Sequence, residues 1–371
     1  MAAAEPSQVD VAIAGGGPVG CALALALAGS GVAVARIADE TGVADRPIAL
    51  SHGSRLILER LDAWRSLVCS AIRTIHVSQQ GFGRTVLRSS DYGLPALGYV
   101  VAYSDLAANL ARRTSAISGS VTGWEPCGDE IVLRFAAGGN EARMQARLLV
   151  LADGGLNRDT GRVTDYGQHA LVAEVTAERA ASGTAWERFT FEGPLALLPF
   201  GDRHALVWSA SPATVEELRG LPDHEFLARL RRAFGGKLGE FRSTGPRSSF
   251  PLSLRRGDVQ PAPRVLAIGN AAQTLHPVAG QGLNLGLQDV RTLSRILAAR
   301  EPVRDAGDWR LLRRYERARA EPILAMDAMV DGLQRFFGAQ GAFAARLRNH
   351  GLNLTDRLEV VKNLLIRQAM S

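Results

Sequence analysis

The residues with the clearest chemical potential lie near position 270, where glycine, proline and amide side chains follow a short apolar run. That run stops at Gly269 and Asn270, and Pro277, Gly280 and Gly282 precede a long stretch with helical periodicity. Glycine has no Cβ, so a planar ligand can lie directly against its backbone. The first turn of the following helix would aim free N–H groups at the same space. The pattern favours a cofactor that becomes anionic on reduction; an ordinary strand–loop–helix connection is the alternative.

A second glycine cluster lies near the amino terminus, where Gly15-Gly16-Gly17-Pro18-Val19-Gly20 fits the pattern G-x-G-x-x-G. A strand-like segment precedes it, and a helical segment and a second strand-like segment follow, over 9–14, 21–28 and 32–37. This order is the context that a dinucleotide-binding motif requires. Gly15 would form the turn, Gly17 would let a pyrophosphate approach, and Gly20 would let the helix pack on the strand. Pro18 and Val19 would line the same site from the first helical turn.

An acidic residue normally ends the second strand of such a unit and holds the adenosine ribose. The expected position is Ala38, and Asp39 and Glu40 come directly after it. A shift of one residue brings a carboxylate into place, so we predict that Asp39 binds the ribose. Weaker ribose binding is the alternative.

The composition is that of a globular protein with a sizeable core. The chain has 371 residues, 46% of them hydrophobic, and a mean hydropathy of +0.01, which exclude a disordered chain and predict no membrane span. Three scattered cysteines argue against a disulfide framework or a metal site and favour a reducing, cytoplasmic compartment. The net charge of +6 comes from scattered arginines, since only Lys237 and Lys362 are lysines. We therefore expect no nucleic-acid partner, although attraction to an anionic membrane surface stays open.

The order of elements predicts an α/β fold in which a β-rich domain interrupts a nucleotide-binding domain. A discontinuous nucleotide domain would comprise 8–68, 100–160 and 260–304, and a β-rich substrate domain 69–99 and 161–259. Within the latter, a hairpin is expected around the glycines at 81–83, and four strands between 170 and 210. Residues 305–371 would form a C-terminal helical region. The β-rich sheet would cover the reactive ring of the cofactor.

Several motifs together resemble the flavin hydroxylases of ubiquinone biosynthesis, within the glutathione-reductase-type flavoproteins. Besides the two glycine segments, the similar stretches are Arg46-Pro47-Ile48-Ala49-Leu50, Ala152-Asp153-Gly154, Trp186-Glu187-Arg188-Phe189-Thr190 and Gly193-Pro194-Leu195-Ala196-Leu197-Leu198-Pro199. Ile75-His76-Val77-Ser78 and the form of 269–277 are similar to the branch that hydroxylates 2-polyprenyl-6-methoxyphenol.

The resemblance implies an FAD-dependent monooxygenase with a glutathione-reductase-type Rossmann domain. It would use molecular oxygen and NAD(P)H, or another reductant, to hydroxylate a lipophilic phenol through a flavin C4a-hydroperoxide. A quinone-biosynthesis complex or the surface of the inner membrane is the partner that such a substrate implies. The resemblance also implies which residues lie at the reactive ring of the flavin: Pro277, Gly280, Gln281 and Gly282. Further cofactor contacts carried over are Arg46, Asp153, Gly154, Gly269, Asn270, Leu283 and Asn284.

The chain departs from this family pattern at three positions. Asn270 stands where aspartate is usual, Asn157 stands where the A-D-G segment usually continues to serine, and Ala38 lacks the ribose carboxylate. These departures keep two alternatives open. One is a flavin enzyme, a hydroxylase or a related reductase, that acts on a soluble aromatic compound. The other is a degenerate FAD-protein scaffold.

Overall fold

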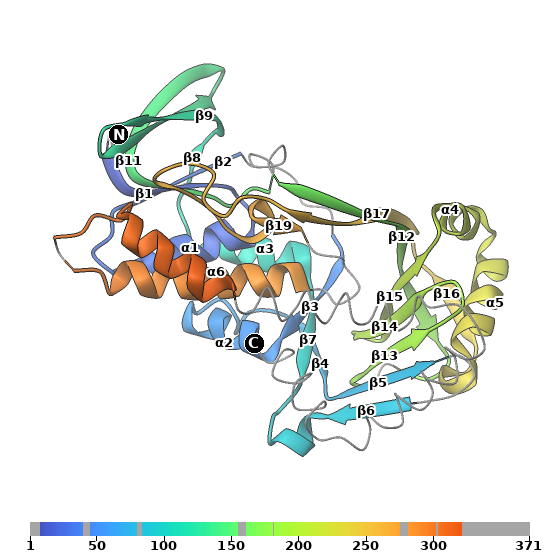
Figure 1. Ribbon diagram of the computed structural model, residues 1–371. Coiled ribbons are helices and arrows are strands. Elements are labelled where there is room, and N and C mark those ends of the chain that lie inside the picture. Colours follow the sequence, from blue (N-terminus) through green and yellow to red (C-terminus); the bar gives the residue numbers. More distant parts are fainter. Residues whose placement is uncertain are drawn as a thin grey trace.

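The computed structural model describes residues 8–39, 45–79, 84–154, 161–180, 182–274, 281–301 and 303–320. These residues form three β-sheets with helices packed against them (Figure 1). The predicted α/β fold with a Rossmann unit and a β-rich insertion is confirmed. The predicted domain boundaries remain predictions.

The first sheet has seven strands in the order β8-β2-β1-β11-β10-β9, and β18 pairs with β11. Strands β1, β2, β11 and β18 run parallel, whereas β9 and β10 are antiparallel additions at one edge. Helix α1 (Pro18–Leu27) connects β1 to β2, which is the predicted strand–helix–strand unit. The strands are β1 (Gln8–Ala14), β2 (Val34–Ala38), β8 (Ile117–Ser118), β9 (Ser120–Cys127), β10 (Glu130–Ala137), β11 (Asn140–Leu151) and β18 (Val265–Ala267).

Helices bury one face of this sheet. Helix α6 (Gln281–Ala298) packs beside α1, and α2 (His52–Arg60), α3 (Tyr103–Ala111) and the helical residues 309–320 complete the layer (Figure 1). The shared core includes Ile13, Leu23, Leu287 and Tyr315, all fully buried. The Ser51 side chain caps the start of α2 by accepting from Ser54 N, and Leu61 ends the helix. Among the described residues, no helix has the length and apolar character needed to cross a membrane.

The second sheet has nine strands in the order β19-β17-β12-β15-β14-β13-β5-β6, with β16 paired to β12. Helices α4 (Pro212–Gly220) and α5 (Asp223–Phe234) cover one face through a core that contains Trp208 and Phe226. Short 3-10 helices are η1 (Ser89–Tyr92), η2 (Gly236–Leu238) and η3 (Gly269–Ala271). The strands are β5 (Thr74–Gln79), β6 (Arg84–Arg88), β12 (Arg162–Ala177), β13 (Thr184–Phe189), β14 (Pro194–Phe200), β15 (Arg203–Ala210), β16 (Phe241–Thr244), β17 (Ser248–Arg256) and β19 (Gln273–Thr274).

A three-stranded antiparallel sheet lies between the other two (Figure 1). Its strands are β3 (Pro47–Ser51), β7 (Gly98–Ala102) and β4 (Cys69–Ile72), in the order β3-β7-β4. We assigned 69–72 to the inserted domain, yet β4 pairs with β7 rather than with the nine-stranded sheet. Of the predicted C-terminal helical region, 309–320 is helical, and 321–371 lies outside the described residues.

Candidate FAD site

The glycine segments meet because the parallel strands that precede them end at the same edge of the first sheet. Gly15 N donates to Ile37 O over 2.9 Å, Ala152 N donates to Ala14 O over 2.8 Å, and Ile268 N donates to Leu151 O over 3.0 Å. These bonds join the ends of β1, β2, β11 and β18. Ligands of open α/β sheets bind at this carboxyl edge of the strands.

The three glycines of the N-terminal motif have different surroundings. A Cβ on Gly20 would lie 2.6 Å from Gly15 O, and one on Gly15 would lie 2.8 Å from Ala152 C. Neither position has room for a side chain, which explains the tight turn and the close packing of α1. A Cβ on Gly17 would meet nothing within 4 Å. Gly17 therefore opens toward the space in which a pyrophosphate would lie.

The N-terminus of α1 provides the donors for such a group. Gly17 is the N-cap residue and offers no capping side chain, and Pro18 occupies the first turn. The free N–H groups of this turn and the helix dipole favour an anion. The Val19 side chain points elsewhere, since Cβ atoms built on Gly269 and Gly286 would lie 3.3 and 2.6 Å from its methyl groups. Val19 thus packs α1 against α6 and can reach a cofactor only through its backbone.

The second half of the site gathers three segments around Asn270. A Cβ on Gly154 would lie 3.3 Å from Asn270 Cβ, and one on Gly282 would lie 3.4 Å from Asn270 Oδ1. Gly154 and Gly269 both have positive φ, +72° and +56°, which glycine adopts without strain. The exposed Asp153 side chain begins the same turn. The structure therefore brings Asp153, Gly154, Gly269, Asn270 and Gly282 together, as predicted.

The end of β2 lies beside the glycine turn. A Cβ on Gly16 would lie 3.1 Å from Ala38 Cβ and 3.4 Å from Asp39 O. Asp39 is exposed directly after β2, in place to meet an adenosine ribose. Arg36 also borders this turn: it is buried, and its Nε has no hydrogen-bond partner among the described residues. Sequence reasoning missed Arg36, because an arginine within a β-strand carries no signal of this kind.

Known proteins resemble the chain over nearly its full length. Residues 126–328 match a protein family described as an FAD binding domain. The ubiquinone hydroxylase UbiL of Rhodospirillum rubrum is 34% identical over 97% of this chain and 89% of its own. The 3-demethoxyubiquinol 3-hydroxylase of Escherichia coli is 30% identical over 97% of this chain and 98% of its own. The chain belongs to the FAD-dependent hydroxylases of ubiquinone biosynthesis.

Solved structures show that the fold is that of flavin monooxygenases. The p-nitrophenol 4-monooxygenase PnpA of Pseudomonas putida superposes with a TM-score of 0.76 at 15% identity, over 98% of both chains. HpxO of Klebsiella pneumoniae, solved with FAD and uric acid, gives 0.73 at 16% identity, over 97% of this chain and 96% of that one. The family and these relatives make the chain an FAD-dependent monooxygenase, which uses molecular oxygen and a reductant.

The geometry of this hydroxylase fits FAD. The open side of Gly17, the uncapped N-terminus of α1 and the unpartnered Arg36 Nε suit the pyrophosphate half. The cluster around Asn270 adjoins the N-terminus of α6, whose first residue is Gln281. That terminus would stabilise negative charge on a flavin ring. Pro277 and Gly280, the other predicted reactive-ring residues, lie outside the described residues.

Two predicted cofactor contacts have side chains that are engaged elsewhere. Asn284 Oδ1 accepts from Ser51 N over 2.8 Å and from Ser54 Oγ over 2.7 Å, and its Nδ2 donates to Ala49 O over 3.2 Å. Asn284 thus fastens β3 and α2 to α6 through its side chain. Leu283 packs against the hydrophobic core. The prediction that the helix N-terminus around these residues stabilises charge on the flavin stays a prediction.

Arg46, predicted to reach the flavin or its phosphates, lies exposed at the start of β3. Its guanidinium carbon is 5.2 Å from the centre of the Tyr103 ring. Burial raises the pKa of the Tyr103 hydroxyl, and the Arg46 charge opposes this shift. Arg46 has no carboxylate partner within the described ranges, so its charge is available for a phosphate.

A buried ion pair, which we did not predict, supports the flavin turn from behind. Asp289 Oδ2 accepts from Gly269 N over 2.9 Å, and Asp289 Oδ1 accepts from Arg319 Nε over 2.8 Å. Both side chains are about 5% exposed. Burial raises the pKa of Asp289, while the Arg319 charge opposes the shift. The helical residues 309–320 thereby hold the turn that precedes Asn270.

The flavin turn also connects the two large sheets. Strand β19, directly after η3, pairs with β17, and Gly257 N donates to Ala272 O over 2.8 Å. Arg255 Nη2 donates to Asn270 O over 2.9 Å. The position of the nine-stranded sheet is therefore tied to the turn that would hold the flavin, as expected for a sheet that covers the ring.

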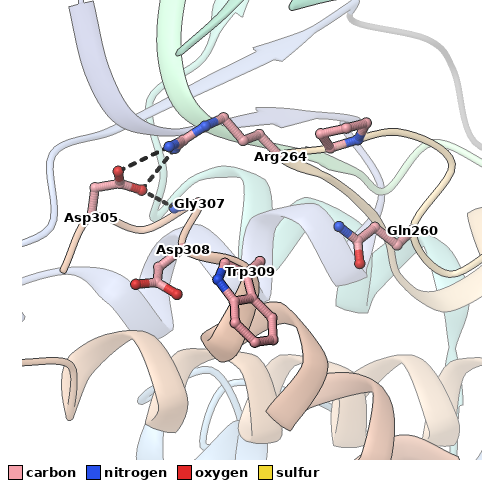
Figure 2. Close-up of a pocket in the computed structure, with 7 residues that line it drawn as sticks. Gln260, Arg264, Asp305, Gly307, Asp308 and Trp309 are labelled. Carbon is pink, nitrogen blue, oxygen red and sulfur yellow. Dashed lines mark hydrogen bonds and ion pairs between the residues drawn. The ribbon is translucent and has the colours of Figure 1, made fainter. Parts of the chain in front are cut away.

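A pocket of about 300 Å³ lies at the other edge of the first sheet (Figure 2). Arg264 directly precedes β18, and Figure 2 shows its guanidinium on Asp305, with N···O distances of 2.8 and 3.1 Å. Asp308 Oδ1 accepts from Arg310 N and caps the last helix. Because this pocket is at the amino ends of the parallel strands, it is separate from the FAD site.

Proposed function

We propose that this monooxygenase hydroxylates the ring of a polyprenylated phenol in ubiquinone biosynthesis, with NAD(P)H as reductant. The observation that carries the proposal is the 34% identity with a ubiquinone hydroxylase over 97% of the chain. The prediction of the 2-polyprenyl-6-methoxyphenol branch forms part of this proposal. Bound FAD supplies the reduction and the oxygen chemistry.

The residues of the chain would bind and orient both molecules. The N-termini of α1 and α6 would hold the anionic parts of the cofactor. The nine-stranded sheet, tied to the flavin turn through β19, would exclude water from the ring and hold the phenol against it. Pro277, Gly280, Gln281 and Gly282 remain the predicted contacts to the reactive ring.

A lipophilic substrate implies work at a cytoplasmic membrane surface or within a complex of quinone-biosynthesis enzymes. Two features support a membrane surface. Phe191, in the turn between β13 and β14, is 90% exposed, and Arg232 lines a surface pocket beside it. The net charge of +6 acts in the same direction.

Quinone profiling of a deletion strain tests the proposal. Loss of the enzyme should lower ubiquinone and accumulate a polyprenylated phenol that lacks one hydroxyl group, and its structure identifies the ring position. Unchanged ubiquinone without such a precursor would contradict the proposal and favour a soluble aromatic substrate. Purified protein without flavin absorption would instead favour the scaffold.

A further inference from the structure

Within the part of the chain that the structure describes, the Glu187 carboxyl group of the nine-stranded sheet has no partner. Glu187 lies on β13 and is partly buried, and no residue in the described ranges forms a hydrogen bond or ion pair with its side chain. Other carboxylates of the same region are paired. Glu174 contacts Arg203 at 2.6 Å, and Glu192 pairs with Arg229. Among the described residues, Glu187 thus differs from these paired carboxylates of the same region.

The surroundings of Glu187 are apolar. Its cross-strand neighbours are Val77 on β5 and Ala196 on β14, and the positions two residues away on β13 are Ala185 and Phe189, both buried. None of these residues is charged. Burial in this environment raises the pKa of Glu187 to about 7. Strongly perturbed pKa values cluster at functional sites.

The side chain points toward the FAD-binding half of the molecule. Ala185, on the same face of β13, packs with Ile72 of β4 and Val100 of β7 in the central sheet. Alternate residues project to opposite faces, so Trp186 and Arg188 lie on the other side. There Trp186 contacts Phe234 of α5, with ring centres 6.0 Å apart. In Figure 1, α5 is on the outer side of the sheet and the central sheet on the inner side.

We propose that Glu187 binds the phenolic hydroxyl of the substrate and acts as its general base, a role that rests on the proposed function. The carboxylate accepts the hydroxyl proton: the O–H bond breaks, its electron pair stays on the phenol oxygen, and Glu187 becomes a neutral acid. The phenolate ring is richer in electrons than the phenol and therefore more reactive toward an electrophilic oxygen. A base with a pKa near the working pH is suited to this transfer.

Binding of 4-heptylphenol at different pH values tests the assignment without turnover. An ionised Glu187 accepts the hydroxyl hydrogen bond, so the wild type should bind about tenfold more tightly at pH 8 than at pH 6. The affinity of E187Q for the probe should be the same at both pH values, whereas that of E187D should increase from pH 6 to pH 8 as in the wild type. The methyl ether of the same probe has no hydroxyl to donate and should show no such increase with any variant. The proposal would be overturned if the affinity of the wild type did not change with pH, or if E187Q showed the same change as the wild type.

Turnover gives a second readout. E187Q should lower kcat by about 100-fold or more, whereas E174Q, which removes a paired carboxylate of the same sheet, should not. The two proposals fail separately. Unchanged quinone profiles in the deletion strain would contradict the role in ubiquinone biosynthesis. The pH dependence of heptylphenol binding would then still support the role of Glu187. If the affinity of the wild type does not change with pH but the deletion strain has an altered quinone content, only the role of Glu187 is contradicted.

Discussion

At the scale of single residues, two carboxyl groups of the fold differ in their partners: Asp289 is buried and paired, whereas Glu187 is partly buried and has no partner among the described residues. Asp289 has a cation, Arg319, and a backbone donor, Gly269 N–H. Among the described residues Glu187 has neither, and its two cross-strand neighbours are apolar. A paired buried charge holds two elements in register, whereas an unpaired one destabilises the folded state unless it is protonated. The pair therefore belongs to the support of the site and the lone carboxyl to its chemistry.

The unpaired state of Glu187 predicts a pH-dependent stability. The folded-state pKa, about 7, is above the ordinary value of 4.5, so the folded state holds the proton longer and stability falls as pH rises between these values. E187Q should therefore gain stability relative to the wild type between pH 5 and pH 8, by at most roughly 3 kcal/mol. Urea unfolding at both pH values measures the difference. If E187Q and the wild type differed in unfolding free energy by the same amount at pH 5 and pH 8, the raised pKa of Glu187 would be contradicted. E174Q, whose parent carboxylate is paired, should show no such gain.

The Asp289–Arg319 pair predicts a large effect from a small substitution. D289N leaves the Arg319 charge buried without an anion and weakens the bond to Gly269 N–H. Unfolding should become easier by about 3–5 kcal/mol, and FAD affinity should fall. D129N is the control, because Asp129 pairs with Arg264 at 3.4 Å and is 87% exposed, so its loss should change stability by less than about 1 kcal/mol. Equal losses in both variants would show that burial does not decide the effect.

At the scale of elements, different glycines of the segment from β1 into α1 serve helix packing and ligand binding. Gly20 lies against Gly15 O, and Gly17 faces open space. Both belong to one motif, yet only the first is required by the fold itself. The distinction follows from which side of α1 each residue occupies.

This separation predicts different defects for two similar substitutions. G20A places a methyl group 2.6 Å from a backbone oxygen, so the protein should lose several kcal/mol of stability. G17A should unfold at nearly the wild-type denaturant concentration but lose FAD affinity, because the methyl group occupies the approach of the pyrophosphate. Denaturant unfolding and flavin fluorescence titration measure the two effects. Tight FAD binding by G17A would contradict the placement of the pyrophosphate.

At the scale of the whole molecule, the FAD site joins parts that are distant in the chain. It combines the turn at 15–20, the end of β11, the turn at 269–274 and the N-terminus of α6. Through β19, the same turn holds the nine-stranded sheet. Occupation of the site should therefore stabilise both large sheets together rather than one domain alone.

Thermal unfolding in the presence of FAD tests this coupling. At 100 times the dissociation constant, FAD should stabilise the folded state by about 2.7 kcal/mol. Circular dichroism, and the fluorescence of a variant that keeps Trp208 of the nine-stranded sheet as its single tryptophan, should report one common rise in Tm. G17A should show no rise at the same FAD concentration. A rise in only one of the two signals would indicate that the sheets unfold independently.

The sequence alone predicted the elements with a local pattern. Gly15, Gly17 and Gly20 lead from β1 into α1, and the four strands expected between 170 and 210 form as β12 to β15. Backbone requirements of this kind are carried by a few neighbouring residues, so they can be recognised before any fold is known. The family was recognised in the same way, from short motifs in fixed order.

Contacts between distant residues were decided only by the tertiary structure. Nothing near Asp289 indicates that Arg319, 30 positions later, neutralises it, and nothing near Asn284 indicates that Ser51 and Ser54 occupy its side chain. Likewise, the pattern around Glu187 does not show which face of β13 is turned toward the cofactor. Charge, burial and direction depend on which elements pack together, and that packing is a property of the whole chain.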